Sequence, residues 1–148
     1  MRQVDMTESR PEVVVGSSVV QAVRDSARTA APHEACGLLL GRVEPRRFVL
    51  TTCVPSRNIA SDPVRRFEVD PAVRLRVHRE ARGGGEPMIG LYHSHPAGSA
   101  APSAVDRRCL YEPGLVWLIT GPDPRWEIRA WLALTDDFRE LPLVVADA

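Results

Sequence analysis

The sequence contains no lysine, few cysteines and no long apolar run. Its 19 basic residues are therefore all arginine, a bias that GC-rich codons explain without a functional reason, and they balance 19 acidic residues. A formal net charge of +0 gives no electrostatic reason to expect nucleic acid or an anionic membrane as a partner. No apolar stretch approaches the roughly 20 residues of a membrane-spanning helix.

The three cysteines are Cys36, Cys53 and Cys109. An odd number without CxxC spacing predicts neither a disulfide framework nor a cysteine zinc knuckle, and it favours a reducing, cytoplasmic location. Residues 1–11 are polar and charged, so we interpret them as a flexible lead-in rather than a signal peptide. The remaining residues, 12–148, have the length and balance of one globular domain.

Hydrophobic periodicity predicts strands alternating with helices. Pro32 ends the first predicted helix, which Ser17 and Ser18 are placed to cap. Asp70 followed by Pro71 is a typical helix start. The expected fold is a mixed α/β sheet flanked by helices. Its predicted strands cover 12–15, 35–41, 47–54, 67–69, 88–92, 115–120, 126–134 and 138–145, and its predicted helices cover 19–30, 71–82 and the residues after 103.

The strongest chemical signal lies where the strand 88–92 ends. His93 and His95 are two residues apart, so in an extended segment both imidazoles point to one face. After the loop 96–102, Ser103 and Asp106 form a Ser-x-x-Asp capping box, which places Asp106 in a first helical turn. Two imidazoles and a carboxylate are ligands that zinc prefers, and three protein ligands with one open position are typical of a catalytic site. The alternative is a hydrogen-bonded surface histidine pair beside an ordinary helix cap.

A zinc hydrolase also needs a base, and Glu34 is the candidate. It stands at the mouth of the apolar strand 35–41, an unusual place for a purely structural carboxylate, and burial there would raise its pKa towards a useful range. An exposed glutamate at a helix end is the alternative. Cys36 is interpreted as a buried strand residue rather than a nucleophile, because no histidine is left to activate it. Tyr92 and the loop 96–102 are expected to contact the substrate.

These residues together resemble the JAMM motif of the MPN-positive metalloproteases. That motif is a Glu, then His-x-His, seven residues, a Ser, two residues and an Asp. The segments "PHEACGLLLG" and "GLYHSHPAGSAAPSAVD" satisfy all of its spacings, and "NIASDPVRRFEVD" is similar to the middle region of the small bacterial members. The resemblance covers about residues 12–135 and implies a cytidine-deaminase-like MPN/JAB fold with a mostly antiparallel sheet.

The resemblance implies a role for each residue. His93, His95 and Asp106 would hold one zinc ion, Glu34 would transfer the proton, and Ser103 would stabilise the oxyanion. Small bacterial members imply a peptidase or isopeptidase acting at the Gly-Gly tail of a ubiquitin-like or sulfur-carrier protein, for example on a carrier–cysteine adduct. Two alternatives stay open, a non-catalytic MPN interaction module and a small zinc amidase with a non-protein substrate. The oligomeric state, a homodimer included, is also open.

Overall fold

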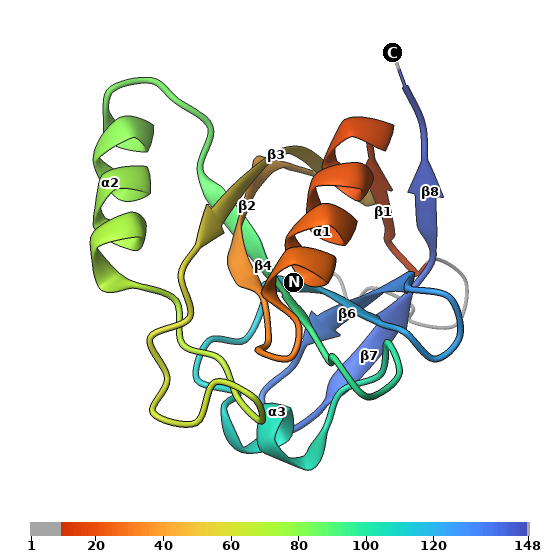
Figure 1. Cartoon of the computed structure of the whole chain (residues 1–148). Coiled ribbons are helices and arrows are strands. Elements are labelled where there is room, and N and C mark those ends of the chain that lie inside the picture. Colours follow the sequence, from red (N-terminus) through yellow and green to blue (C-terminus); the bar gives the residue numbers. More distant parts are fainter. Residues whose placement is uncertain (1–9, 148) are drawn as a thin grey trace.

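A single curved sheet of eight strands organises the molecule. The computed structural model describes residues 10–147, so most of the predicted lead-in, residues 1–9, lies outside the described residues. The sheet has the order β7-β6-β5-β4-β2-β3-β1-β8 and mixes antiparallel with parallel pairs, as the predicted α/β class requires (Figure 1). The elements are β1 (Glu12–Val15), α1 (Ser17–Ala30), β2 (Cys36–Glu44), β3 (Arg47–Ser56), α2 (Pro71–Arg82), β4 (Met88–Ser94), α3 (Ala104–Arg108), β5 (Val116–Gly121), β6 (Glu127–Ala133), β7 (Phe138–Leu141) and β8 (Leu143–Val145).

The two helix starts turned out differently. Asp70 caps α2 as predicted, because its side chain accepts from the N–H of Ala72 and Pro71 occupies the first helical position. The predicted serine cap of α1 is wrong. Gly16 is the N-cap residue and makes no side-chain cap bond, whereas the N–H and hydroxyl of Ser17 both donate to Asp147. The C-terminal segment therefore supplies the anchor that the local sequence does not.

The last predicted strand, 138–145, is in fact two strands separated by Pro142. β7 pairs with β6 at one edge of the sheet, whereas β8 pairs with β1 at the other edge. Proline cannot donate to a ladder, so it marks the change of partner. Because one residue joins the two edge strands, the sheet curls until its edges adjoin. The predicted strand at 67–69 is reduced to a single bridge between Val69 and Asn58.

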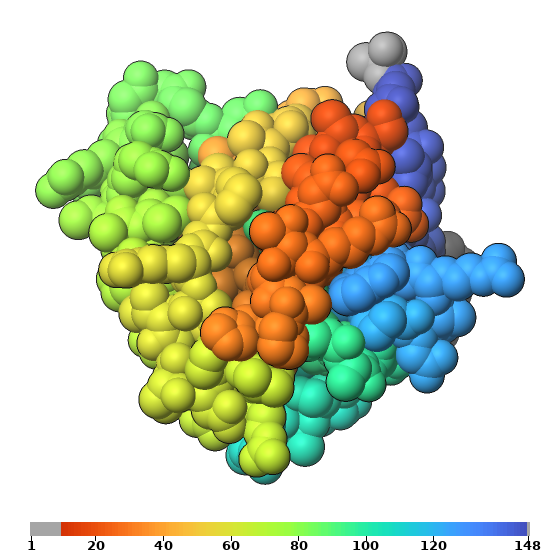
Figure 2. All heavy atoms as spheres, viewed as in Figure 1, coloured from red at the N-terminus to blue at the C-terminus, as the bar shows by residue number. Residues whose placement is uncertain are grey.

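The helices cover opposite faces of the sheet. Side chains alternate along a strand, so Leu39, Tyr92 and Leu118 pack in the cluster beneath α1, and their neighbours Leu38, Leu91 and Trp117 pack with α2. Burying each large apolar side chain contributes about 1.5–3 kcal/mol. In the space-filling view α1 lies across the front face, and the loop before α2 meets the α3 region at the lower edge (Figure 2). None of the helices described between residues 10 and 147 is long and apolar enough to span a membrane.

This topology brings distant residues to one edge of the sheet. β2 and β4 are antiparallel, with Cys36 opposite His93, so the start of β2 lies beside the end of β4. β5 runs parallel to β4 on its other side and pairs Ile119 with His93. Glu34, just before β2, is therefore placed next to the histidine pair that ends β4.

Candidate active site

His93 and His95 leave the end of β4 on the same side, as their spacing predicts. Nε2 of His93 lies 3.1 Å from Nε2 of His95, and the two ring centroids are 4.8 Å apart. His93 is completely buried, whereas His95 is partly exposed. The pair therefore has a dry side within the fold and an open side towards solvent.

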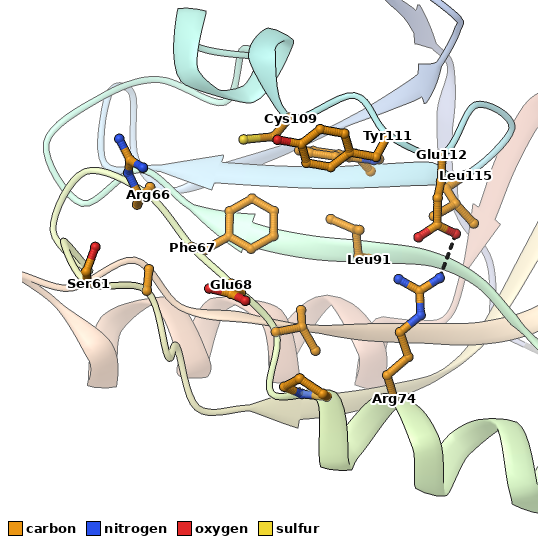
Figure 3. Close-up of a pocket in the computed structure, with 14 residues that line it drawn as sticks. Ser61, Arg66, Phe67, Glu68, Arg74, Leu91, Cys109, Tyr111, Glu112 and Leu115 are labelled. Atoms are coloured by element: carbon orange, nitrogen blue, oxygen red, sulfur yellow. Dashed lines mark hydrogen bonds and ion pairs between the residues drawn. The ribbon is translucent and has the colours of Figure 1, made fainter.

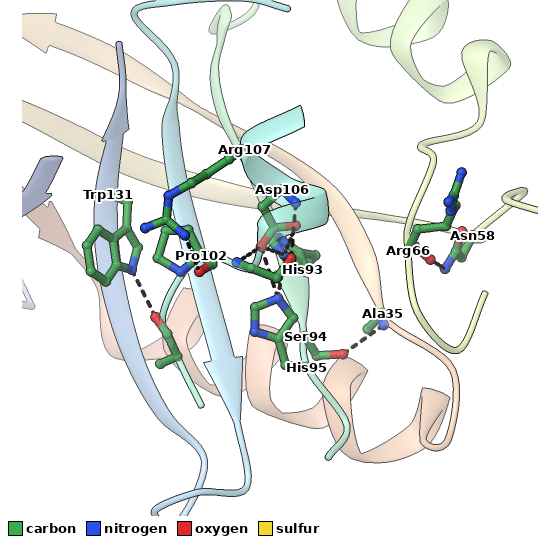
Figure 4. A network of polar contacts seen from close by, with 12 residues as sticks. Ala35, Asn58, Arg66, His93, Ser94, His95, Pro102, Asp106, Arg107 and Trp131 are labelled. Atoms are coloured by element: carbon green, nitrogen blue, oxygen red, sulfur yellow. Dashed lines mark hydrogen bonds and ion pairs between the residues drawn. The ribbon is translucent and has the colours of Figure 1, made fainter. Parts of the chain in front are cut away.

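Asp106 faces both imidazoles from the first turn of α3. Its carboxylate lies 3.0 Å from Nε2 of His93 and 3.0 Å from Nε2 of His95. The predicted capping box is present: the Ser103 hydroxyl accepts from the N–H of Asp106 at 3.0 Å, and the N–H of Ser103 donates to the Asp106 carboxylate at 2.9 Å. The motif that starts the helix thus also aims the carboxylate at the histidines (Figure 4).

The loop 96–102 is tied down along its length. Nδ1 of His95 lies 2.8 Å from the carbonyl oxygen of Ser99, so Nδ1 donates this bond, and in the neutral imidazole Nε2 keeps a free lone pair. The indole N–H of Trp131 donates to the carbonyl of Ala100 at 2.9 Å. Gly121 allows the close approach on the other side, because a Cβ there would overlap the carbonyl oxygen of Gly98. These contacts orient the second imidazole before any ligand arrives.

The donor set fits a zinc ion. Three contacts of 3.0–3.1 Å join Nε2 of His93, Nε2 of His95 and the Asp106 carboxylate into a triangle. With Nε2 of His95 unprotonated, at most one imidazole proton is available, so the three contacts cannot all be hydrogen bonds. Zinc–nitrogen bonds of about 2.0–2.1 Å in a tetrahedron separate ligand atoms by about 3.3 Å, close to these spacings. A cation shared by three lone pairs would fit this convergence.

The pKa values of His93 and Asp106 match ligands that bind without their protons. Burial alone would lower the pKa of His95, but the hydrogen bond and charge of Asp106 and the carbonyl of Ser99 outweigh it and raise that pKa. Burial is the main cause that lowers the pKa of His93, which keeps its imidazole neutral. Burial alone would raise the pKa of Asp106, but the charges and hydrogen bonds of His93 and His95 outweigh it and hold that pKa well below its ordinary value. A neutral imidazole and an ionised carboxylate are the forms that coordinate metals.

Glu34 approaches the same point from the start of β2. One carboxylate oxygen lies within 4.8 Å of a ring nitrogen of each histidine, and the residue is 5% exposed. Burial raises the pKa of Glu34 to about 8, with Asp106 and Asp62 adding to the rise and His95 opposing it. Its Oε1 is buried without a hydrogen-bond partner among residues 10–147. A carboxylate with a raised pKa and a free oxygen beside a metal site has the properties of a general base.

Two carboxylates thus compete for the role of third ligand, and their distances separate them. Asp106 lies within 3.1 Å of both Nε2 atoms, whereas Glu34 is placed only within 4.8 Å of a ring nitrogen of each histidine. The Asp106 carboxylate is also held by the Ser103 N–H. This geometry favours Asp106 over Glu34 as the third ligand.

Aromatic rings form the inner wall of the site. Phe67 stacks on His93 with ring centroids 4.3 Å apart, and Trp117 meets the same imidazole edge-on at 5.4 Å. Both rings also line a cavity of about 560 Å³ between the loop before α2, α2 itself and the segment after α3 (Figure 3). At the end of this groove away from the metal site, Arg74 and Glu112 form an ion pair of 2.6 Å. The groove therefore reaches Phe67 and Trp117, the two rings that contact the buried imidazole of His93.

Several expectations for neighbouring residues are now settled. Tyr92 does not face the site: it is fully buried under α1 with its hydroxyl 3.1 Å from that of Ser26, so its predicted substrate contact is wrong. Cys36 is buried and burial raises its pKa to about 12, in agreement with a structural role. Trp117 packs in the core and also touches His93.

Sequence reasoning missed the two residues that join Glu34 to the rest of the site. The Ser94 hydroxyl accepts from the N–H of Ala35 at 2.8 Å, which clamps the start of β2 to the end of β4. The Asn58 side chain donates to the carbonyl of Glu34 at 3.1 Å. The position of Ser94 between the two histidines was a readable signal, since alternation turns its side chain to the face opposite the two imidazoles.

Comparison with known proteins agrees with this geometry. Residues 16–134 match the family described as prokaryotic homologues of the JAB domain. The chain is 34% identical to a desampylase of Haloferax volcanii over 142 residues, which covers 95% of this chain and 99% of that protein. It is 30% identical to a CysO-cysteine peptidase of Mycobacterium tuberculosis over 140 residues, which covers 91% and 92% of the two chains. A solution structure from Desulfitobacterium hafniense superposes with a TM-score of 0.82 at 30% identity, covering 92% and 94%.

The chain belongs to the family of prokaryotic JAB domains. The fold inferred from the JAMM resemblance is confirmed by the family match and by the structural neighbour. The matched span contains all five residues that the resemblance singled out, at positions 34, 93, 95, 103 and 106.

Proposed function

We propose that this protein is a zinc-dependent peptidase that cleaves the bond after the C-terminal tail of a ubiquitin-like or sulfur-carrier protein. The carrying observation is the convergence of His93, His95 and Asp106, with Glu34 beside them. Relatives whose names specify desampylation and cleavage of a CysO–cysteine bond support the same reaction class.

The proposed metal is one zinc ion per chain, held by His93, His95 and Asp106. When bound there, zinc would polarise the scissile carbonyl and lower the pKa of a water molecule to about 7. The ligand residues need no rearrangement, because Ser99 already fixes the tautomer of His95 and Ser103 already orients Asp106.

Glu34 and Ser103 carry the proposed proton and charge chemistry. Glu34 takes a proton from the attacking water while the oxygen of that water bonds to the carbonyl carbon. Glu34 then delivers the proton to the departing nitrogen as the C–N bond breaks. The Ser103 hydroxyl uses its oxygen to accept from the Asp106 N–H, so its own proton is free to be donated to the carbonyl oxygen. One such donor is worth about 3–4 kcal/mol in the transition state.

The groove beside the site would receive part of the proposed substrate. Its floor is apolar at Phe67, Leu91 and Trp117, and its outer end carries the Arg74–Glu112 pair. An extended Gly-Gly tail is narrow enough to lie between two side-chain walls, with the folded carrier outside. Cytoplasmic location stays a prediction, and no oligomeric state is predicted.

The test combines metal analysis with cleavage of a defined conjugate. The purified chain is expected to contain one zinc, and to release cysteine or a lysine-linked peptide from the Gly-Gly terminus of a carrier protein, followed by intact mass spectrometry. A carrier truncated before its tail competes for the folded surface alone and serves as control. Cleavage of small amides with no activity on carriers would favour the amidase alternative, and zinc binding without any hydrolysis would favour the interaction module.

A further inference from the structure

Asn58 is the only asparagine of the sequence, and every hydrogen-bonding position of its side chain is used. Oδ1 accepts from the N–H of Ala60 and of Glu68, both at 3.0 Å. Nδ2 donates to the carbonyls of Arg66 at 2.9 Å and Glu34 at 3.1 Å, with Pro63 at 3.4 Å. All five partners are main-chain atoms, so the side chain organises backbone rather than substrate.

The backbone it holds is the loop 59–68. Its neck is closed by the bridge between Asn58 and Val69 and by the N–H of Ile59 donating to Glu68 at 3.0 Å. Near its end the loop carries Phe67, the ring that stacks on His93. In its middle the carbonyl of Pro63 accepts the N–H of Glu34 at 2.7 Å. One loop therefore touches both the metal-binding imidazole and the main chain of the base.

The peptide units around Glu34 are consequently held from two directions. Ser94, between the two histidines, fixes the following residue Ala35 through its N–H and carbonyl. Asn58 and Pro63 fix the carbonyl and N–H of Glu34 itself. The preceding residue His33 is exposed, so the contacts from the loop are what define the chain just before β2.

We propose that Asn58 is a positioning residue for the base: its carboxamide locks the loop 59–68 onto the main chain of Glu34, so that the carboxylate and the Phe67 wall of the site keep one arrangement. This inference rests on the proposed peptidase function. This set of partners needs a planar group with two N–H donors and one oxygen that accepts two hydrogen bonds, which makes asparagine specific here. Because the same loop lines the groove, a bound tail would press on the element that holds the base.

The experiment uses the zinc-loaded full chain with Asn58→Ala and Asn58→Asp. Asn58→Ala removes every contact, whereas Asn58→Asp keeps the two acceptor bonds and turns an oxygen towards the Glu34 carbonyl. We expect kcat at saturating conjugate to fall about 10–100-fold in both variants, since misplacing a catalytic group by about 1 Å has that effect. Bound zinc is expected to stay at one per chain. Hydrogen exchange of the Glu34 amide and of segment 59–68 is expected to accelerate at least about tenfold.

Val23→Ala is the control for simple loss of stability, because it removes buried methyl groups from α1, away from the loop. The proposal is overturned when the Asn58 variants keep kcat within twofold of Val23→Ala, or when the whole loss lies in KM. It is equally overturned when neither variant folds, since the residue is then structural. If the wild-type chain cleaves no carrier conjugate, the proposed function fails by itself. Hydrogen exchange then tests the role of Asn58 by itself. An unchanged exchange rate of the Glu34 amide in the Asn58 variants rejects that role.

Discussion

The ligand half of the site and the base half come from very different lengths of chain. His93, His95 and Asp106 lie within one strand end, one loop and one helical turn, whereas Glu34 is some sixty residues upstream and reaches them only through the pairing of β2 with β4. The ligand half is held by contacts within and beside residues 93–106. The base half depends on Ser94 and on the loop 59–68. Metal binding is therefore expected to survive changes that disable proton transfer, and the two functions separate by mutation.

Removing a ligand is expected to have the largest effect. Asp106→Ala deletes the carboxylate that faces both imidazoles, so bound zinc falls to a small fraction per chain and hydrolysis falls by at least about 10⁴-fold. Zinc analysis after dialysis and conjugate cleavage check this. Asp137→Ala is the control, because that exposed carboxylate also pairs with α3, through Arg107, and zinc should be unaffected. Full zinc in Asp106→Ala would transfer the ligand role to Glu34.

The base half is expected to control how the stability of the metal-free protein depends on pH. Glu34 has a pKa of about 8 in the fold against an ordinary value of 4.5, so the folded state retains a proton that the unfolded state releases. Below pH 4.5 this group has no effect on the free energy of unfolding, and its cost grows as the pH rises from 4.5 to about 8 and is constant above that. Glu34→Gln should therefore stabilise the metal-free chain at pH 9 relative to pH 5 by about 3–5 kcal/mol.

Urea unfolding at both pH values measures that difference. Glu86→Gln removes an exposed carboxylate and serves as the reference. Parallel pH curves for wild type and Glu34→Gln would show that Glu34 ionises freely in the fold, and the base half would lose its main electrostatic argument.

Ser103 has two roles, since it orients the ligand Asp106 and is proposed to bind the oxyanion. Ser103→Ala should lower kcat about 10²–10³-fold with zinc retained. Loss of the cap should also reduce stability by about 1 kcal/mol. Ser17→Ala, another serine at a helix start, should lower stability alone. Equal kcat values for the two variants would reduce Ser103 to a cap.

The smallest effect is expected at the groove, outside both halves. Tyr111 is 80% exposed on the rim of the groove, and exposed aromatic side chains of this kind are common binding contacts. Tyr111→Ala should raise KM for a carrier conjugate about 3–10-fold with kcat unchanged. Leu75→Ala, an exposed apolar change on α2 outside the groove lining, is the comparison. Identical KM values in the two variants would place the carrier elsewhere.

The difference between the halves also explains what could be predicted from the sequence. The His-x-His spacing and the Ser-x-x-Asp cap are local patterns with a definite geometry, so the arrangement of His93, His95 and Asp106 was predictable. The role of Asn58 was not, because its partners at positions 34 and 60–68 meet only in the folded chain. The split of 138–145 at Pro142 was missed for the same reason: a strand pattern does not reveal which strand it will pair with.

The most direct test of the account is zinc-loaded Glu34→Gln, with metal content and kcat determined on the same sample. Glutamine keeps the shape of the side chain and removes its ability to take a proton at neutral pH. We expect this variant to hold one zinc per chain and its kcat to fall at least about 10³-fold. Activity near that of the wild type would contradict the role of Glu34 as base, and loss of zinc would contradict the separation of ligand and base on which the account depends.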